Sequence, residues 1–244
     1  GRFNDNCKKV YKIKLSDLDK NVKIIPKSEI SWNKMINNME EKSSIIINRN
    51  IKKYNSQANL INIVLSNLNN NDHVFIGNSM PIRILNQYSG KFSKKIKLFG
   101  NNITRGIDGV LSSALGMSYI NKNKNNILFI GDISLFYDIN ALHILNNEDI
   151  NLAVIAINNN GGQIFSYLPY ANKNIEKFSK FWITPLSTKI KDLAKLFNIK
   201  YYNFSVKKIS KEIGNIIHQR GVKIIEINIK NSEDIKFINK INNY

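Results

Sequence analysis

The chain has 244 residues, 43% of them hydrophobic, which is enough for one large domain or two small ones with a real core. Its formal net charge is +18, but the lysines are spread along the chain among Asn and Ile, and this spread argues against a nucleic-acid-binding surface. A run of 18 apolar residues is absent from the sequence, which excludes a membrane-spanning helix, and a single cysteine, Cys7, excludes an internal disulfide and fits a reducing compartment.

The first 50 residues are expected to form an arm that leads into the main domain. Val10–Leu15 alternates polar and apolar residues as a strand does, and Pro26 then interrupts the pattern. Residues 30–53 carry apolar side chains at a spacing that predicts one or two helices. The main domain would then occupy residues 51–244.

The main domain is expected to open with a helix over 57–68, capped by Ser56. A short buried strand, His73–Ile76, then leads into a helix that starts near Ser79. Such a start points backbone N–H groups and the Ser79 hydroxyl at the crevice beyond the strand, and Arg83 lies one turn further on the same face. The residues alone allow two simpler interpretations with equal weight, a helix cap at Ser79 and a surface charge at Arg83.

The next strand, Ile96–Phe99, runs into a polar loop over 100–109 and then into a helix of small residues that ends near Met117. Two runs rich in Ile and Val follow, Ile127–Ile130 and Leu152–Ile157, and we expect both to be buried strands. Between them, Tyr137–Leu145 has helical apolar spacing, so the three segments predict a right-handed strand–helix–strand unit.

Polar residues and glycines follow the two central strands. Asp132 comes directly after the first strand, and Asn159 and Gly161 come after the second. Because the carboxyl ends of neighbouring parallel strands face one crevice, these groups are expected to meet there. A carboxylate, an amide oxygen and a backbone carbonyl are hard-oxygen ligands for Mg²⁺ or Mn²⁺, and glycines let the backbone approach a phosphate closely. The pattern therefore predicts a divalent-cation and diphosphate site.

Strands and helices continue to alternate toward the carboxyl terminus, after an irregular connection over Tyr167–Pro185. The expected elements are a helix capped by Ser187 or Thr188 that runs through Phe197, strands Lys200–Asn203 and Val222–Ile227, and helices Val206–His218 and Ser232–Ile241. This alternation predicts an α/β fold, a doubly wound parallel sheet with helices on both faces.

Two stretches of the chain carry a resemblance to a known family. Gly131–Asp132–Ile133 is followed, after the 24 residues from Ser134 to Ile157, by NNNGGQIFSYLP at 158–169, and residues 77–83 read GNSMPIR. This pattern resembles the thiamine diphosphate-dependent enzymes, and within them the 2-succinyl-5-enolpyruvyl-6-hydroxy-3-cyclohexene-1-carboxylate (SEPHCHC) synthase family of menaquinone and phylloquinone biosynthesis. The resemblance covers the whole chain against roughly the last two fifths of a typical family member.

The resemblance implies a cofactor site and a substrate site. It implies that thiamine diphosphate is held with Mg²⁺ (or Mn²⁺), that the metal ligands are Asp132, Asn159 and Gly161, and that Ser79 and Ser134 lie beside the cofactor. Ile107 matches the apolar side chain that wedges between the cofactor rings, which makes it the expected catalytic residue. Further residues would contact cofactor or substrate, namely Ile164, Phe165 and Leu168, with Arg83 and either Asn102 or Arg105 on substrate carboxylates.

The implied reaction decarboxylates 2-oxoglutarate and adds the succinyl semialdehyde carbanion to isochorismate. In the family, a Glu on a separate pyrimidine-binding domain activates the cofactor, and Glu148 and Glu226 do not match it. Residues 1–50 would end a central domain, and residues 51–244 would be the diphosphate- and Mg-binding domain. We therefore expect a half-site that needs the pyrimidine-binding and central domains, on the same chain or another, within a homodimer or tetramer in the cytoplasm or plastid stroma.

One departure from the family keeps other functions open. Asn102 stands where the family has an Arg thought to hold a substrate carboxylate, and Ile103 replaces a Gly. Arg and Asn are not exchangeable for bidentate carboxylate binding, although Arg105 could substitute. The alternatives are a different 2-oxoacid decarboxylase or carboligase, and a non-catalytic basic interaction domain that retains the fold.

Overall fold

A computed structural model describes residues 30–90, 94–101, 103, 105–172 and 176–243. The chain divides into two compact units, Gly1–Ser43 and Ser44–Tyr244. The described part of the first unit belongs to helix α2 (Ile30–Ile51), which confirms the helix expected over 30–53. The strand expected at Val10–Leu15 lies outside the described residues, and the domain boundary expected after residue 50 stays a prediction.

The second unit is built on a six-stranded sheet in which every strand is parallel to its neighbours, in the order β2-β1-β3-β4-β6-β5. The strands are β1 (His73–Ile76), β2 (Lys97–Phe99), β3 (Asn126–Gly131), β4 (Ala153–Asn158), β5 (Lys200–Phe204) and β6 (Lys223–Asn228). Each lies within one or two residues of the expected strand. The Ile- and Val-rich central strands are buried on both faces, as strands under two helical layers must be.

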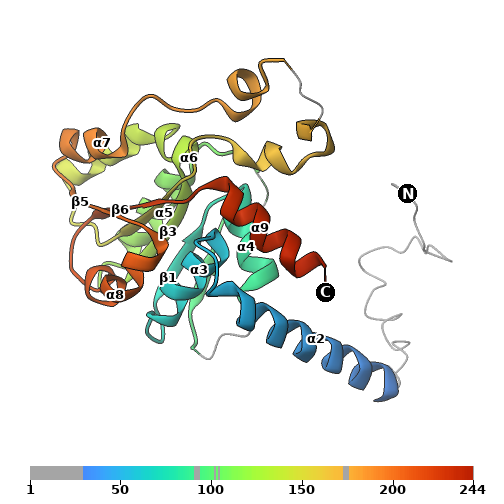
Figure 1. Cartoon of the computed structure of the whole chain (residues 1–244). Coiled ribbons are helices and arrows are strands. Elements are labelled where there is room, and N and C mark those ends of the chain that lie inside the picture. Colours follow the sequence, from blue (N-terminus) through green and yellow to red (C-terminus); the bar gives the residue numbers. More distant parts are fainter. Residues whose placement is uncertain (1–29, 91–93, 102, 104, 173–175, 244) are drawn as a thin grey trace, which may run out of the picture. The chain divides into compact units, whose positions relative to one another are not determined.

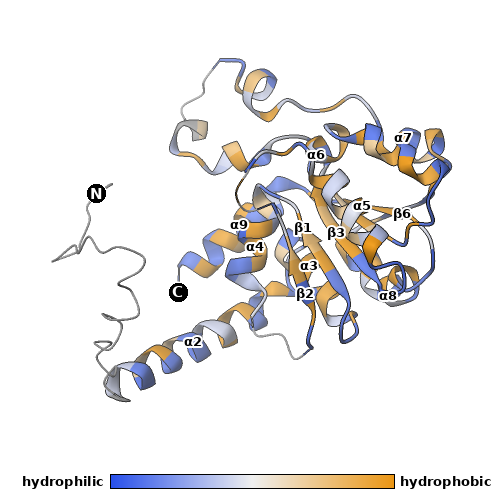
Figure 2. Cartoon of the chain, turned by 180° about the vertical axis from the view of Figure 1, so that it is seen from behind, coloured by the Kyte–Doolittle hydropathy of each residue, from blue (hydrophilic) through white to orange (hydrophobic). Residues whose placement is uncertain are grey.

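Helices cover both faces of the sheet (Figure 1). One face packs on α3 (Gln57–Ser66), α4 (Met80–Tyr88), α8 (Val206–Ile217) and α9 (Asn231–Asn242). The other packs on α5 (Val110–Ile120), α6 (Asp132–Phe136), η3 (Ile139–Asn146) and α7 (Ile190–Leu196). Successive strand residues alternate between the two cores, and Figure 2 shows the hydrophobic colour concentrated on the central strands. The expected doubly wound α/β fold is confirmed.

The order of the strands creates a switch point between β1 and β3. These neighbours are followed by helices on opposite faces, α4 after β1 and α6 after β3. In open parallel sheets the crevice for ligands forms at such a point, beyond the carboxyl ends of the strands. The fold therefore places the residues that follow β1, β3 and the adjacent β4 around one crevice.

The crossover between β3 and β4 differs from the expected single helix over Tyr137–Leu145. A short α-helix, α6, begins at Asp132, and a 3₁₀ helix, η3, follows it. The break falls at Asp138, whose carboxylate accepts hydrogen bonds from the Ser112 backbone N–H (2.7 Å) and hydroxyl (2.8 Å). The helix expected over Tyr137–Leu145 is therefore present as the 3₁₀ helix η3, and the short helix α6 before it was not predicted.

Two other expectations concern helix starts. Ser56 caps α3 as expected, since its hydroxyl oxygen accepts a hydrogen bond from the Asn59 N–H at 3.2 Å. The cap expected at Ser187 or Thr188 is wrong, because α7 begins later, with Lys189 at the N-cap and no side-chain capping bond. The irregular connection over Tyr167–Pro185 follows the 3₁₀ turn η4 (Gln163–Tyr167) and contains a second 3₁₀ turn, η5 (Pro169–Asn172), and a π turn, η6 (Ser179–Ile183).

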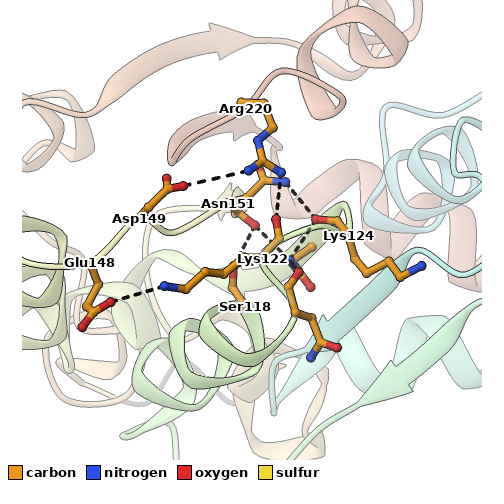
Figure 3. Close-up of polar contacts among 9 residues, drawn as sticks. Ser118, Lys122, Lys124, Glu148, Asp149, Asn151 and Arg220 are labelled. Carbon is orange, nitrogen blue, oxygen red and sulfur yellow. Dashed lines mark hydrogen bonds and ion pairs between the residues drawn. The ribbon is translucent and has the colours of Figure 1, made fainter.

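The amino edge of the sheet, opposite the crevice, is closed by a polar network (Figure 3). The Ser118 hydroxyl donates to the Asn151 carbonyl (2.7 Å), and the Asn151 side-chain amide donates to the Lys124 carbonyl (2.8 Å). Arg220 donates to the Lys122 carbonyl (2.8 Å). Ser118 and Asn151 are buried, so these bonds satisfy polar groups that would otherwise lose water without replacement. Among the described residues, no helix is both long enough and apolar enough to cross a bilayer.

Candidate functional site

A small cavity of about 60 Å³ lies at the ends of β3 and β4. In the sheet register Gly131 lies opposite Ile157, so the residues that follow, Asp132 and Asn159, leave the sheet at neighbouring points. The cavity wall contains five of the residues expected to hold cofactor or metal, Ser79, Asp132, Ser134, Asn159 and Gly161. The structure therefore brings these residues together from three separate segments of the sequence, which follow β1, β3 and β4.

Asp132 links the two strand ends. Its side chain is buried, one oxygen accepts the Ile133 N–H (2.8 Å), and the other accepts the Gly161 N–H (2.8 Å). Burial raises the pKa of Asp132 above the usual range, although the backbone hydrogen bonds oppose that rise. A buried carboxylate without a cation is costly, and a divalent ion beside it would offset that cost.

The loop that follows β4 has a conformation that requires glycine. Asn160 has φ of 63° and Gly161 has φ of 113°, both in the left-handed region. A β-carbon on Gly161 would overlap the carbonyl oxygen of Ile183 in η6. The close approach of the two backbones thus explains why glycine occupies position 161. The same contact packs the loop against the connection over 167–185.

Several oxygen atoms remain available at the small cavity. Within the described part of the chain, the half-buried Asn159 side chain makes no hydrogen bond, and the Gly161 carbonyl accepts one, from the Gln163 N–H at 2.8 Å. A carbonyl oxygen has two lone pairs, so Gly161 retains one for a ligand. Groups of three or more His, Cys, Asp or Glu side chains that could hold a metal are absent from the described residues. A cation here would therefore be bound by mixed carboxylate, amide and carbonyl oxygens, the set that Mg²⁺ and Mn²⁺ accept.

Ser79 lies at the amino end of α4 with φ of 72° and ψ of −128°, an uncommon conformation for a residue with a side chain. Its side chain makes no capping hydrogen bond, which removes the simpler interpretation of Ser79 as a helix cap. The Arg83 guanidinium donates to the Ser79 carbonyl at 2.6 Å and so lies beside the same strand end. The unpaired N–H groups of α4 and the Ser79 hydroxyl together form an anion-binding arrangement.

Ile107 separates the small cavity from a much larger one. It lines both cavities, and its carbonyl accepts a hydrogen bond from the Ser134 hydroxyl at 2.6 Å. Ser134 is buried, so its hydroxyl proton is used to hold the Ile107 backbone, and a lone pair is left toward the cavity.

The larger cavity has a volume of about 760 Å³ and a mostly apolar wall. It contains the remaining described residues expected at the site: Arg83, Arg105, Ile164, Phe165 and Leu168. Phe165 is fixed by an edge-to-face contact with Trp182, with ring centroids 5.3 Å apart. Asn102, expected on a substrate carboxylate, lies outside the described residues.

Three residues at the small cavity were not anticipated from the sequence. Asn78 donates from its side chain to the Gly106 carbonyl at 2.5 Å and joins the two loops that border both cavities. Gln57 and Gln163 line the small cavity. Asn78 lies within the GNS stretch and could have been included on that ground, whereas Gln57 has no local sequence signal.

Comparison with protein families matches residues 81–227 to the family described as "Thiamine pyrophosphate enzyme, C-terminal TPP binding domain". The chain belongs to this family. As a thiamine pyrophosphate (thiamine diphosphate) domain, it has the expected fold, and the matched range contains most of the residues around the two cavities.

Curated relatives of this thiamine pyrophosphate domain carry the name 2-succinyl-5-enolpyruvyl-6-hydroxy-3-cyclohexene-1-carboxylate synthase. The protein of Leuconostoc mesenteroides is 39% identical over 162 residues, which cover 66% of this chain and 29% of that protein. That of Listeria monocytogenes is 36% identical over 162 residues (66% and 27%), and that of Staphylococcus epidermidis is 32% identical over 173 residues (71% and 30%). The resemblance seen in the sequence is confirmed, and the aligned part of the chain spans less than a third of the length of these relatives.

Proposed function

We propose that this domain is the thiamine diphosphate- and Mg²⁺-binding part of a SEPHCHC synthase. The whole enzyme would decarboxylate 2-oxoglutarate and add the four-carbon product to isochorismate, a step of menaquinone or phylloquinone biosynthesis. One observation carries the proposal: Ile107 lines both a small cavity with Asp132, Asn159 and Gly161 and a large, mostly apolar cavity with two arginines. The small cavity would match the diphosphate, Ile107 would match the reactive ring, and the large cavity with its arginines would match the carboxylate substrate.

The residues of the small cavity fit the diphosphate end of the cofactor and its cation. Asp132, Asn159 and the Gly161 carbonyl would bind Mg²⁺ or Mn²⁺, which also accepts oxygen ligands from phosphate and water. The amino end of α4 and the Ser79 hydroxyl would bind phosphate oxygens of the cofactor. When bound, thiamine diphosphate would supply the electron sink for the loss of carbon dioxide from a 2-oxoacid.

The residues of the large cavity would orient the substrates and exclude water. Ile107, held through its carbonyl by Ser134, would offer the cofactor a rigid apolar contact between the two cavities. Arg83 and Arg105 would bind substrate carboxylates, since a guanidinium pairs with a carboxylate through two hydrogen bonds. Phe165 and Leu168 would keep the reacting carbon away from water, which strengthens those charge interactions.

The acid that activates the cofactor would come from another domain. Glu148 pairs with Lys122 at 3.4 Å on the amino edge of the sheet, and Glu226 is hydrogen-bonded inside β6 and lines neither cavity. The chain alone would therefore bind cofactor without turnover, and activity would need the pyrimidine-binding and central domains in a homodimer or tetramer.

Isothermal titration calorimetry tests the proposal. The chain should bind thiamine diphosphate in the presence of Mg²⁺, and Asp132→Asn should remove the Mg²⁺ dependence. With the missing domains supplied, 2-oxoglutarate and isochorismate should be consumed together. Failure of the completed protein to bind thiamine diphosphate would refute the proposal.

A second candidate is a thiamine diphosphate-dependent decarboxylase or carboligase for a different 2-oxoacid. Asn102 favours this second candidate, because an asparagine cannot make the bidentate contact that an arginine makes with a carboxylate. Assays of the completed enzyme with pyruvate and with 2-oxoglutarate separate the two candidates. If the enzyme is a SEPHCHC synthase, Arg105 would have to replace the arginine that the family has at position 102. In that case Arg105→Ala should raise the KM for 2-oxoglutarate more than the KM for pyruvate.

A further inference from the structure

A buried carboxylate supports the Asn-rich loop from the side away from the small cavity. Glu226 lies in β6 opposite Ala156 of β4 and is buried. One of its oxygens accepts a hydrogen bond from the Asn158 side-chain amide at 2.6 Å. The Asn158 amide oxygen in turn accepts the Asn160 N–H at 3.2 Å. Glu226 is thus connected, through a single side chain, to the turn that carries Asn159 and Gly161.

The other Glu226 oxygen is held by a chain of hydrogen bonds across the sheet edge. The Tyr201 hydroxyl donates to it at 2.5 Å, Asn203 donates to the Tyr201 oxygen at 3.0 Å, and Asn228 donates to the Asn203 side-chain oxygen at 3.1 Å. Burial, followed by the bond to Glu226, raises the pKa of Tyr201 to about 12, so the phenol stays protonated and remains a donor. The orientation of Glu226 is therefore fixed from both sides.

The contacts of Glu226 point to a role beyond packing. Within the described part of the chain Glu226 has no ion-pair partner, and its two oxygens are held instead by Asn158 and Tyr201. Glu226, Asp132, Asn158 and Asn160 line one further cavity of about 240 Å³. Two acidic side chains are therefore in contact with this loop, Asp132 through the Gly161 N–H and Glu226 through Asn158.

We propose that Glu226 is a positioning residue for the cation site, which acts through Asn158 and Asn160 on the loop that presents Asn159 and Gly161. The inference rests on the proposed cation site. Partners that orient metal ligands affect affinity strongly, and their loss commonly weakens binding about 10- to 100-fold.

The test compares variants of the whole 244-residue chain by Mn²⁺ binding in the presence of thiamine diphosphate, measured by electron paramagnetic resonance. Glu226→Ala should raise the Mn²⁺ dissociation constant about 10- to 100-fold. Glu226→Gln should recover most of the affinity, because glutamine keeps the oxygen that accepts from Asn158. Asn151→Ala, a control that removes a buried hydrogen bond at the opposite edge, should lower the melting temperature and leave Mn²⁺ affinity unchanged.

A second measurement does not depend on bound metal. Amide hydrogen exchange at Asn160 and Gly161, without Mn²⁺ or thiamine diphosphate, should become faster in Glu226→Ala than in wild type, and should not change in Asn151→Ala. Both amides are bonded in the loop conformation, to Asn158 and Asp132, so they report its order directly.

The outcomes separate this inference from the proposed function. If Asp132→Asn loses Mn²⁺ and Glu226→Ala binds it like wild type, the positioning role is overturned and the cation site stands. If wild type binds no Mn²⁺ with thiamine diphosphate, the cation site is refuted, and hydrogen exchange alone decides whether Glu226 orders the loop. Equal exchange in wild type and Glu226→Ala would overturn that role too.

Discussion

Neutralising Asp234 should stabilise the chain at neutral pH. Asp234 in α9 is buried, and its carboxylate accepts two hydrogen bonds from Gln57, one from the backbone N–H (2.7 Å) and one from the side-chain amide (2.8 Å). Burial raises the pKa of Asp234 from 3.8 to about 6, even though the bonds from Gln57 oppose the rise. The folded state therefore binds this proton more tightly than the unfolded state does.

The sign and size of the effect follow by linkage. For a carboxyl whose pKa is raised by folding, stability is lost as pH rises from the unfolded pKa through the folded one, here from 3.8 to about 6. A rise of this size corresponds to about 3 kcal/mol. The neutral amide that Asp234→Asn introduces would resemble the protonated acid, since its oxygen still accepts the Gln57 N–H and the Gln57 side-chain amide can turn to accept in return.

Urea unfolding followed by circular dichroism between pH 4 and 7.5 measures the difference. We expect Asp234→Asn to match wild type near pH 4 and to gain up to about 3 kcal/mol by pH 7.5, which is roughly 1 M in the urea midpoint. Asp149→Asn is the matched control, because its carboxylate is 77% exposed in a surface ion pair and should show no such pH-dependent difference. Parallel curves for wild type and Asp234→Asn across this range would refute the reasoning.

Four other substitutions test the site and its surroundings. Gly161→Ala should cost at least about 2 kcal/mol of stability and abolish Mn²⁺ binding, because the new β-carbon meets backbone at a positive φ. Gly116→Ala, its control in an exposed turn of α5 with open space around it, should raise the free energy of unfolding by about 0.5–1 kcal/mol; a loss there would contradict the reasoning. Ser134→Ala should cost about 1 kcal/mol and raise the thiamine diphosphate dissociation constant, measured by calorimetry, because the Ile107 carbonyl loses its donor. Asn151→Ala should cost about 1–3 kcal/mol in urea unfolding with unchanged cofactor affinity, and a parallel fall in affinity would show that the two edges of the sheet are coupled.

The strands could be predicted because each is a short apolar run with polar residues or glycine at its ends. β3 and β4 are buried on both faces, so their sequences contain unbroken Ile and Val rather than an alternating pattern. The ends of these strands gave the positions of Asp132 and Asn159, and the parallel order of the sheet then brought the two together. Local pattern and topology were sufficient for this part of the site.

Features that depend on distant partners could not be predicted. Asp138, between α6 and η3, accepts its hydrogen bonds from Ser112, 26 residues earlier. Gln57 meets Asp234 across 177 residues, and Glu226 meets Asn158 across 68. A carboxylate inside an apolar strand gives no sequence signal of its partner, because such pairings arise from tertiary packing rather than from spacing along the chain.

The hydrogen bond from the Gly161 N–H to Asp132 makes the two strand ends a single mechanical unit. A change at either end would disturb the other, so substitutions at the two positions should show strong epistasis, with the double variant little worse than either single one. Natural selection would then act on the pair as one trait. In a lineage that lost the Asp132 carboxylate, selection to keep Gly161 would also end, and both positions would accumulate substitutions.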